Sequence, residues 1–162
     1  MHKYSIYILS GPVHSGKTTA LLNWREVTSD IYGIFTPVIN NKRVFMDAST
    51  KDIFEMETTD STDSILIGKY MFSKKGFSKA IDILSTASKN NTGWLVIDEV
   101  GPLELKKQGF YTILQEIISK EYNVLKLMLV VRETLVEDVI RFFNFTKTNY
   151  KIISSTDDLF FK

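Results

Sequence analysis

The chain has 162 residues, of which 44% are hydrophobic and 24% are charged, and its formal net charge is +1. This length suits one domain spanning residues 1–162, and the small net charge gives no indication of a nucleic-acid partner or of an anionic membrane surface. The absence of cysteine excludes disulfides and cysteine-based zinc sites, and two histidines are too few for a histidine-rich metal site.

The chain opens with MHKYSIYILSG, in which a basic start and an apolar stretch loosely imitate a signal peptide. Cleavage there would remove an apolar strand, expected at residues 3–10, that leads directly into a glycine-containing loop. We therefore interpret this stretch as part of the folded domain. No apolar run approaches the ~20 residues that a membrane-spanning helix needs, so no membrane partner is expected and the predicted location is cytoplasmic.

A helix is expected over residues 16–29, and a region of short strands follows it. Turn residues, including Asn40-Asn41, separate these strands, which is typical of antiparallel hairpins. We therefore predict a β-hairpin insert at about residues 32–57. Its β-like runs are 32–39, 43–49 and 52–57.

The rest of the chain alternates apolar strands with amphipathic helices. Strands are expected at 64–72, 93–101, 124–131 and 150–154, and helices at 76–89 and 133–143. Another helix is expected to carry one apolar face made of Phe110, Ile113, Leu114, Ile117 and Ile118. This alternation predicts an α/β fold with a mostly parallel sheet and helices on both faces. In such folds, ligands bind at the carboxyl ends of the strands.

The stretch GPVHSGKTT has the spacing of a phosphate-binding P-loop, with Gly11, Gly16, Lys17 and Thr18 at its defining positions. The glycines let the backbone N–H groups wrap phosphate oxygens, and the following helix directs its positive end at the anion. Lys17 is expected to reach the β- and γ-phosphates, and the Thr18 hydroxyl is expected to ligate Mg²⁺. The predicted nucleotide-binding residues are Gly11, Val13, His14, Ser15, Gly16, Lys17, Thr18 and Thr19.

His14 lies within this loop and is a candidate catalytic base. The interpretation we favour is that its backbone matters and its side chain faces solvent.

Two acids follow the apolar residues of WLVIDEVG. Asp98 fits the role of the acid that a P-loop enzyme places near its Mg²⁺. Glu99 is the candidate that orients the attacking water or accepts its proton. The same stretch also matches a D-x-x-G pattern of switch GTPases, but the sequence has no N-K-x-D guanine-reading motif. The tandem acids favour an additional-strand NTPase that uses a glutamate.

Two arginines and a group of phenylalanines are weaker candidates. Arg132 directly follows a predicted strand and is therefore expected at the ligand edge of the sheet, where it would stabilise charge on the γ-phosphate or pair with an acid such as Glu133. Arg43 lies in the predicted hairpin, where an exposed turn arginine is the favoured interpretation. The remaining candidates for base stacking are Phe142, Phe143 and Phe145, for which a place in the core is favoured.

The stretches GPVHSGKTT, GIFTPVINNKR and VIDEVGPLEL, in this order, resemble the small nucleoside-triphosphatase family typified by the hyperthermophile and cancer-related NTPases. The resemblance implies a RecA-like P-loop fold and Mg²⁺-dependent hydrolysis of nucleoside triphosphates with loose base selection. It also places Glu104 at the glutamate of the family's M-E pair, with Leu103 in the methionine position.

The leading hypothesis is therefore hydrolysis of a nucleoside triphosphate, ATP or GTP, with Lys17, Glu99 and Arg132 as catalytic residues. Asp98 and Thr18 are the predicted ligands of the cofactor Mg²⁺. One alternative is a kinase that transfers phosphate to a nucleotide or another small acceptor, although the chain has only four arginines and no arginine-rich lid. Another alternative is a nucleotide-dependent regulatory switch, which the DEVG pattern permits.

Overall fold

The computed structural model describes residues 5–12, 15–90, 92–120 and 125–159. The strands are β1 (Ile6–Gly11), β2 (Ile31–Phe35), β3 (Val38–Ile39), β4 (Lys42–Asp47), β5 (Ile53–Glu55), β6 (Ser64–Ile67), β7 (Tyr70–Ser73), β8 (Trp94–Asp98), β9 (Lys126–Arg132) and β10 (Tyr150–Ile153). The α-helices are α1 (Lys17–Val27), α2 (Lys74–Ala87), α3 (Pro102–Leu105), α4 (Tyr111–Ile118) and α5 (Val136–Phe142). Short 3₁₀ turns are η1 (Ser61–Asp63), η2 (Glu133–Leu135) and η3 (Thr156–Leu159).

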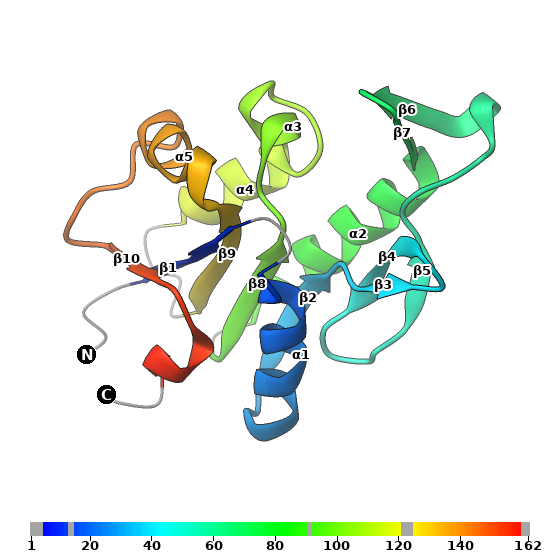
Figure 1. Ribbon diagram of the computed structural model, residues 1–162. Coiled ribbons are helices and arrows are strands. Elements are labelled where there is room, and N and C mark those ends of the chain that lie inside the picture. Colours follow the sequence, from blue (N-terminus) through cyan, green and yellow to red (C-terminus); the bar gives the residue numbers. More distant parts are fainter. Residues whose placement is uncertain (1–4, 13–14, 91, 121–124, 160–162) are drawn as a thin grey trace.

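The central sheet has the strand order β10-β1-β9-β8-β2-β4-β3, and β5 pairs with β4. The first five strands of this order run parallel, and β4 adds antiparallel to β2 (Figure 1). β9 lies between β1 and β8, so an extra strand separates the strand before the phosphate loop from the strand that ends at Asp98. This is the additional-strand arrangement that the tandem acids indicated, and the α/β fold class is confirmed.

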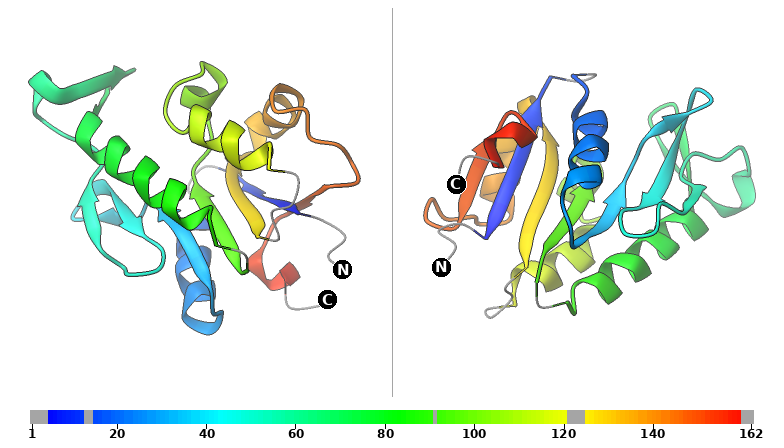
Figure 2. Two further views of the ribbon diagram at one scale, coloured as in Figure 1. Left: turned by 180° about the vertical axis from the view of Figure 1, so that it is seen from behind. Right: turned by 90° about the horizontal axis from the view of Figure 1, so that it is seen from below.

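Helices cover both faces of the sheet, as expected for buried parallel strands (Figure 2). On one face, α2, α4 and α5 pack on alternate residues of β1, β8 and β9 and form the larger apolar cluster. On the other face, α1 inserts Leu21 and Trp24 against Tyr7, Trp94 and Met128. The two clusters together hold the strands in place, so their carboxyl ends form one fixed edge.

The predicted amphipathic helices form largely as expected. In α2, Phe77, Ala80 and Leu84 are buried, because residues three and four apart share one helix face. The face predicted for the later helix is also in the core, where α4 and the preceding Phe110 contribute the buried side chains. The short α3 lies before this helix and contains a buried glutamate, Glu104.

The predicted hairpin insert at 32–57 is wrong in its first part. Residues 32–35 belong to β2, which pairs in parallel with β8 inside the main sheet. The hairpin itself is formed by β3 and β4, and its turn residues Asn40 and Asn41 both have positive φ, at 53° and 63°. Two such residues form the tight turn that suits a two-residue hairpin. The apolar character of β2 gave no indication of whether its partner was parallel or antiparallel.

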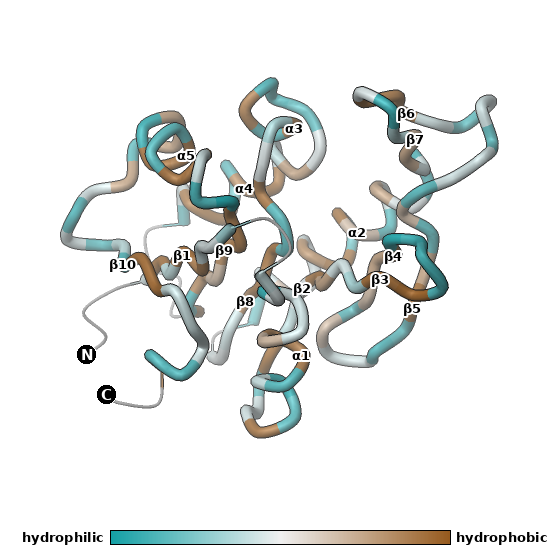
Figure 3. The backbone as a smooth tube through the Cα atoms, viewed as in Figure 1, coloured by the Kyte–Doolittle hydropathy of each residue, from teal (hydrophilic) through white to brown (hydrophobic). Residues whose placement is uncertain are grey.

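The strand predicted at 64–72 is in fact a hairpin, in which β6 pairs antiparallel with β7 in a separate two-stranded sheet. The chain reverses at Gly68-Lys69, and Gly68 has a φ of 58°. Glycine accepts this conformation without the steric cost that a Cβ would bring. Figure 1 shows the hairpin beyond the amino-terminal end of α2, and the hydropathy colouring in Figure 3 shows β6 as hydrophobic.

Candidate functional site

Three adjacent strands end together at one edge of the sheet and bring the predicted site residues close. Gly11 of β1 is in register with Arg132 of β9, and Asp98 of β8 is in register with Val130 of β9. A cavity of about 360 Å³ opens at this edge. It is lined by Ser15, Gly16, Lys17, Thr18, Thr19, Leu22, Thr36, Pro37, Val38, Arg43, Asp98, Glu99, Val130 and Arg132.

The loop between β1 and α1 forms one wall of this cavity. Gly16 precedes the helix with a φ of 83°, a left-handed conformation that favours glycine. The Lys17 ammonium group folds back on the loop, where Nζ donates to the carbonyl oxygens of Gly11 at 3.1 Å and Pro12 at 2.8 Å. The positive end of α1 therefore faces the cavity together with a lysine, which suits an anionic ligand. The predicted residues Val13 and His14 lie outside the described residues.

Asp98 lines the same cavity and is only 2% exposed. Its Oδ2 atom accepts hydrogen bonds from the Thr18 hydroxyl at 2.9 Å and from the Thr36 backbone N–H at 3.1 Å. Burial raises the pKa of Asp98, and these two hydrogen bonds partly oppose that effect. A buried carboxylate beside a hydroxyl is an oxygen donor set that fits a hard cation such as Mg²⁺.

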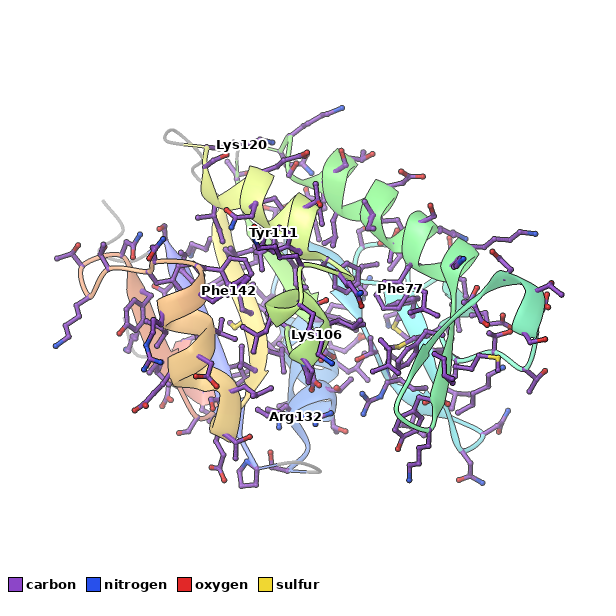
Figure 4. All side chains as sticks on the ribbon, turned by 90° about the horizontal axis from the view of Figure 1, so that it is seen from above. Phe77, Lys106, Tyr111, Lys120, Arg132 and Phe142 are labelled. Atoms are coloured by element: carbon purple, nitrogen blue, oxygen red, sulfur yellow. The ribbon has the colours of Figure 1, made fainter. Side chains whose placement is uncertain are left out.

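Glu99 follows Asp98 and turns its carboxylate towards Arg132. The Glu99 Oε1 atom lies 3.3 Å from Arg132 Nε, and the Glu99 side chain is 20% exposed. Arg132 was expected either at the ligand edge or in a pair with a surface acid such as Glu133. Arg132, labelled in Figure 4, lines the cavity at the ligand edge. Its ion pair is with Glu99.

The structure corrects the place predicted for Arg43. It was expected to be an exposed turn residue, but it is half-buried on β4 and lines the cavity. Its positive charge lowers the pKa of Asp98, although the burial of Asp98 has the larger effect. Sequence reasoning could not place it because β4 reaches the site only by pairing with β2.

Thr36 was missed, although it directly follows β2. The signal was available in principle, because residues after a parallel strand lie at the ligand edge. It was not identified because the hairpin insert was predicted to begin at residue 32, which placed Thr36 inside the insert. Thr36 donates its backbone N–H to Asp98, so every residue except proline could supply this donor.

Glu104 organises the loop that follows the acidic pair. Its carboxylate accepts the backbone N–H of Gly101 at 2.8 Å and that of Phe110 at 2.9 Å. Burial raises its pKa to about 7, and the nearby Glu99 charge adds to this effect. Glu104 therefore ties the start of α3 to the start of α4 and fixes the chain directly after Glu99.

The phenylalanines near the end of α5 are core residues, as favoured. Phe143 and Phe145 are buried, and Phe142 packs edge-on against Phe143 with ring centroids 5.1 Å apart. Phe142 also meets Tyr111 of α4, at a centroid distance of 5.8 Å (Figure 4). These rings line neither wall of the cavity described above.

Comparison with known proteins agrees with this geometry. Residues 6–156 match a protein family described as NTPase. The structure is similar to that of THEP1 from the hyperthermophile Aquifex aeolicus, with a TM-score of 0.69, 21% identity, and coverage of 94% of this chain and 91% of that one. It is also similar to a human cancer-related nucleoside triphosphatase, with a TM-score of 0.68, 18% identity, and coverage of 96% and 90%. No curated protein sequence matches significantly.

Proposed function

The chain belongs to the NTPase family, and we propose that it hydrolyses nucleoside triphosphates, ATP or GTP, to diphosphate and inorganic phosphate. One observation carries the proposal. A single cavity is lined by Lys17 of the phosphate loop, by the buried Asp98 and by Glu99. These three groups supply what phosphoanhydride cleavage requires: a positive charge that binds phosphate, a ligand for the cation and a base that orients the attacking water.

Triphosphate binding rests on the loop before α1. Backbone N–H groups at the start of a helix bind phosphate oxygens, and Lys17 adds a mobile positive charge. Lys17 Nζ donates to the carbonyl oxygens of Gly11 and Pro12. We infer that these bonds are exchanged for bonds to the β- and γ-phosphates.

Mg²⁺ is the cofactor that the donor set favours. Thr18 and Asp98 are the residues that would hold it, because they line the cavity with two oxygen atoms 2.9 Å apart. When bound, Mg²⁺ neutralises phosphate charge. A bound cation would also compensate for the burial of the Asp98 carboxylate, which the neighbouring hydrogen bonds offset only in part.

Glu99 is the group that we assign to the water. Its carboxylate is only partly exposed and is oriented by Arg132. A carboxylate held in this way can orient a water molecule for attack and accept its proton. The Arg132 guanidinium lines the same cavity, where it stabilises negative charge that develops on the transferred phosphoryl group.

The experiment that tests this function measures phosphate release from a panel of nucleoside triphosphates, with and without Mg²⁺. We expect Mg²⁺-dependent release by the wild type and a large loss of both binding and turnover in Lys17→Ala. Lys147→Ala is the matched control, because Lys147 is exposed in the loop before β10 and lines no part of the cavity. Undiminished hydrolysis by Lys17→Ala would rule out the proposed site.

A further inference from the structure

A second cavity, of about 240 Å³, adjoins the phosphate cavity on the side away from the phosphate loop. None of the phosphate-loop residues that line the first cavity lines this one. The two cavities share one wall, which consists of Thr36, Arg43, Asp98, Glu99 and Arg132. Glu99, the residue that we assign to the attacking water, therefore lines both the triphosphate cavity and the second cavity.

The rest of the second cavity is largely apolar and aromatic. Tyr70 and Phe72 of β7 have nearly parallel rings, with centroids 6.2 Å apart and an interplanar angle of 24°. Phe77 of α2 and Phe110 before α4 are buried beneath them. Figure 4 shows Phe77 and Arg132 on different elements, α2 and β9, that contribute to this cavity. The remaining lining residues are Met56, Ile67, Gly101, Pro102, Leu103 and Glu104.

The two ends of this cavity differ in chemistry. At the shared wall, Glu99 can accept a proton, and Arg43 and Arg132 supply positive charge. At the other end, aromatic rings favour a planar group, since ring faces stack on one another. The volume lies below the range of about 300–1,000 Å³ for drug-sized ligands. A fitting molecule is thus smaller than a nucleotide, with a planar ring at one end and a polar group at the other.

We propose that this cavity binds a small alcohol that carries a planar aromatic ring, the chemistry of a nucleoside, as an acceptor of the γ-phosphoryl group. The proposal rests on the proposed function, because the donor is the triphosphate held by the phosphate loop. In the absence of the acceptor, water takes the same position beside Glu99 and the reaction is hydrolysis.

The transfer step is balanced without another reagent. The acceptor hydroxyl oxygen forms a bond to the γ-phosphorus, and the bond from the γ-phosphorus to its bridging oxygen breaks. The electron pair of that bond leaves with the nucleoside diphosphate, and the hydroxyl proton passes to the Glu99 carboxylate. The products are a phosphate monoester of the alcohol and the diphosphate.

The test incubates the protein with Mg²⁺ and γ-labelled ATP or GTP, together with nucleosides or benzyl alcohol, and separates labelled ester from labelled inorganic phosphate. We expect acceptor-dependent ester formation that competes with phosphate release. In Tyr70→Ala, the KM for the acceptor should rise about tenfold through lost stacking. Phosphate release without acceptor should change by less than about twofold, because Tyr70 is 47% exposed and lies outside the phosphate cavity.

Leu66→Ala is the matched control on the same hairpin. Leu66 is 68% exposed and lines neither cavity, so neither ester formation nor phosphate release should change. Absence of labelled ester with every acceptor, or ester formation with an unchanged KM in Tyr70→Ala, would overturn the acceptor site. If the wild type released no phosphate in the absence of an acceptor, the proposed hydrolysis would instead be overturned. Labelled ester is measured independently of labelled phosphate, so the two failures can be told apart.

Discussion

The Nε atom of Arg132 lies 3.3 Å from the Oε1 atom of Glu99, at the wall that the two cavities share. The two residues come from neighbouring strands, since Glu99 follows β8 and Arg132 ends β9. The pair restricts the rotamers of a carboxylate that is otherwise free to turn. It therefore couples the direction of the proposed base to the position of the Arg132 guanidinium.

Glu99→Gln removes the proton acceptor and retains a side chain of the same shape. We expect the rate of triphosphate hydrolysis to fall by about 10²–10⁴-fold, while nucleotide affinity stays close to that of the wild type. Single-turnover phosphate release and nucleotide titration measure the two effects. Glu133→Gln, an exposed neighbour of Arg132, should behave as the wild type. Full activity in Glu99→Gln would remove Glu99 from the mechanism.

Arg132→Ala removes a transition-state charge and also frees Glu99 to turn. We expect kcat to fall by up to about 10³-fold, the lower end of what a catalytic arginine contributes, with a smaller change in nucleotide affinity. Arg132→Lys should recover only part of the rate, because lysine keeps the charge and loses the planar guanidinium. Steady-state kinetics test both variants.

Arg141→Ala is the control for the loss of an arginine, because Arg141 is 78% exposed on α5 and pairs with Asp138. Its kinetics should match those of the wild type. Equal loss in the Arg141 and Arg132 variants would indicate a general effect on folding and contradict a role at the site.

Glu104 should make stability depend on pH. Its pKa is about 7 in the folded protein against an ordinary 4.5, so the folded state binds the proton more tightly. This contribution to the free energy of unfolding is fully present below about pH 4.5 and is lost as the pH rises through 7, by at most about 3 kcal/mol. The Coulomb interaction with Glu99 acts in the same direction.

Chemical denaturation of the wild type and Glu104→Gln between pH 4.5 and 8 measures this effect. The stability advantage of the wild type over the variant should shrink as the pH rises. Parallel stability profiles in the two proteins would show that Glu104 does not titrate in this range.

Gly33→Ala should weaken the sheet where β2 meets β8. Gly33 has a φ of 113°, and a Cβ built there collides with the backbone carbonyl of Val96. We expect the free energy of unfolding to fall by more than the about 1–3 kcal/mol that strained backbone alone costs, because the Val96 carbonyl must also shift. Gly68→Ala is the matched control, because its φ is 58° and its Cβ would meet no atom within 4 Å. Equal losses in the two variants would contradict a packing role for Gly33.

The α/β class, the phosphate loop and the acidic pair could all be predicted from the amino-acid sequence. These features are local, because each depends on residue types at fixed spacing within one strand, turn or helix start. Lys17, Thr18, Asp98 and Glu99 could therefore be named as the candidate site before any fold was known, and the cavity brings them together.

The pairing partner of each strand and the surroundings of the site became known only from the folded chain. An apolar stretch such as residues 32–35 is equally compatible with parallel and antiparallel neighbours, so the place of β2 beside β8 was not predictable. Arg43 and the second cavity follow from that placement, since β4 and the β6–β7 hairpin reach the site from distant parts of the chain. Such contacts depend on pairing between distant parts of the chain, which the spacing of residues within one element does not indicate.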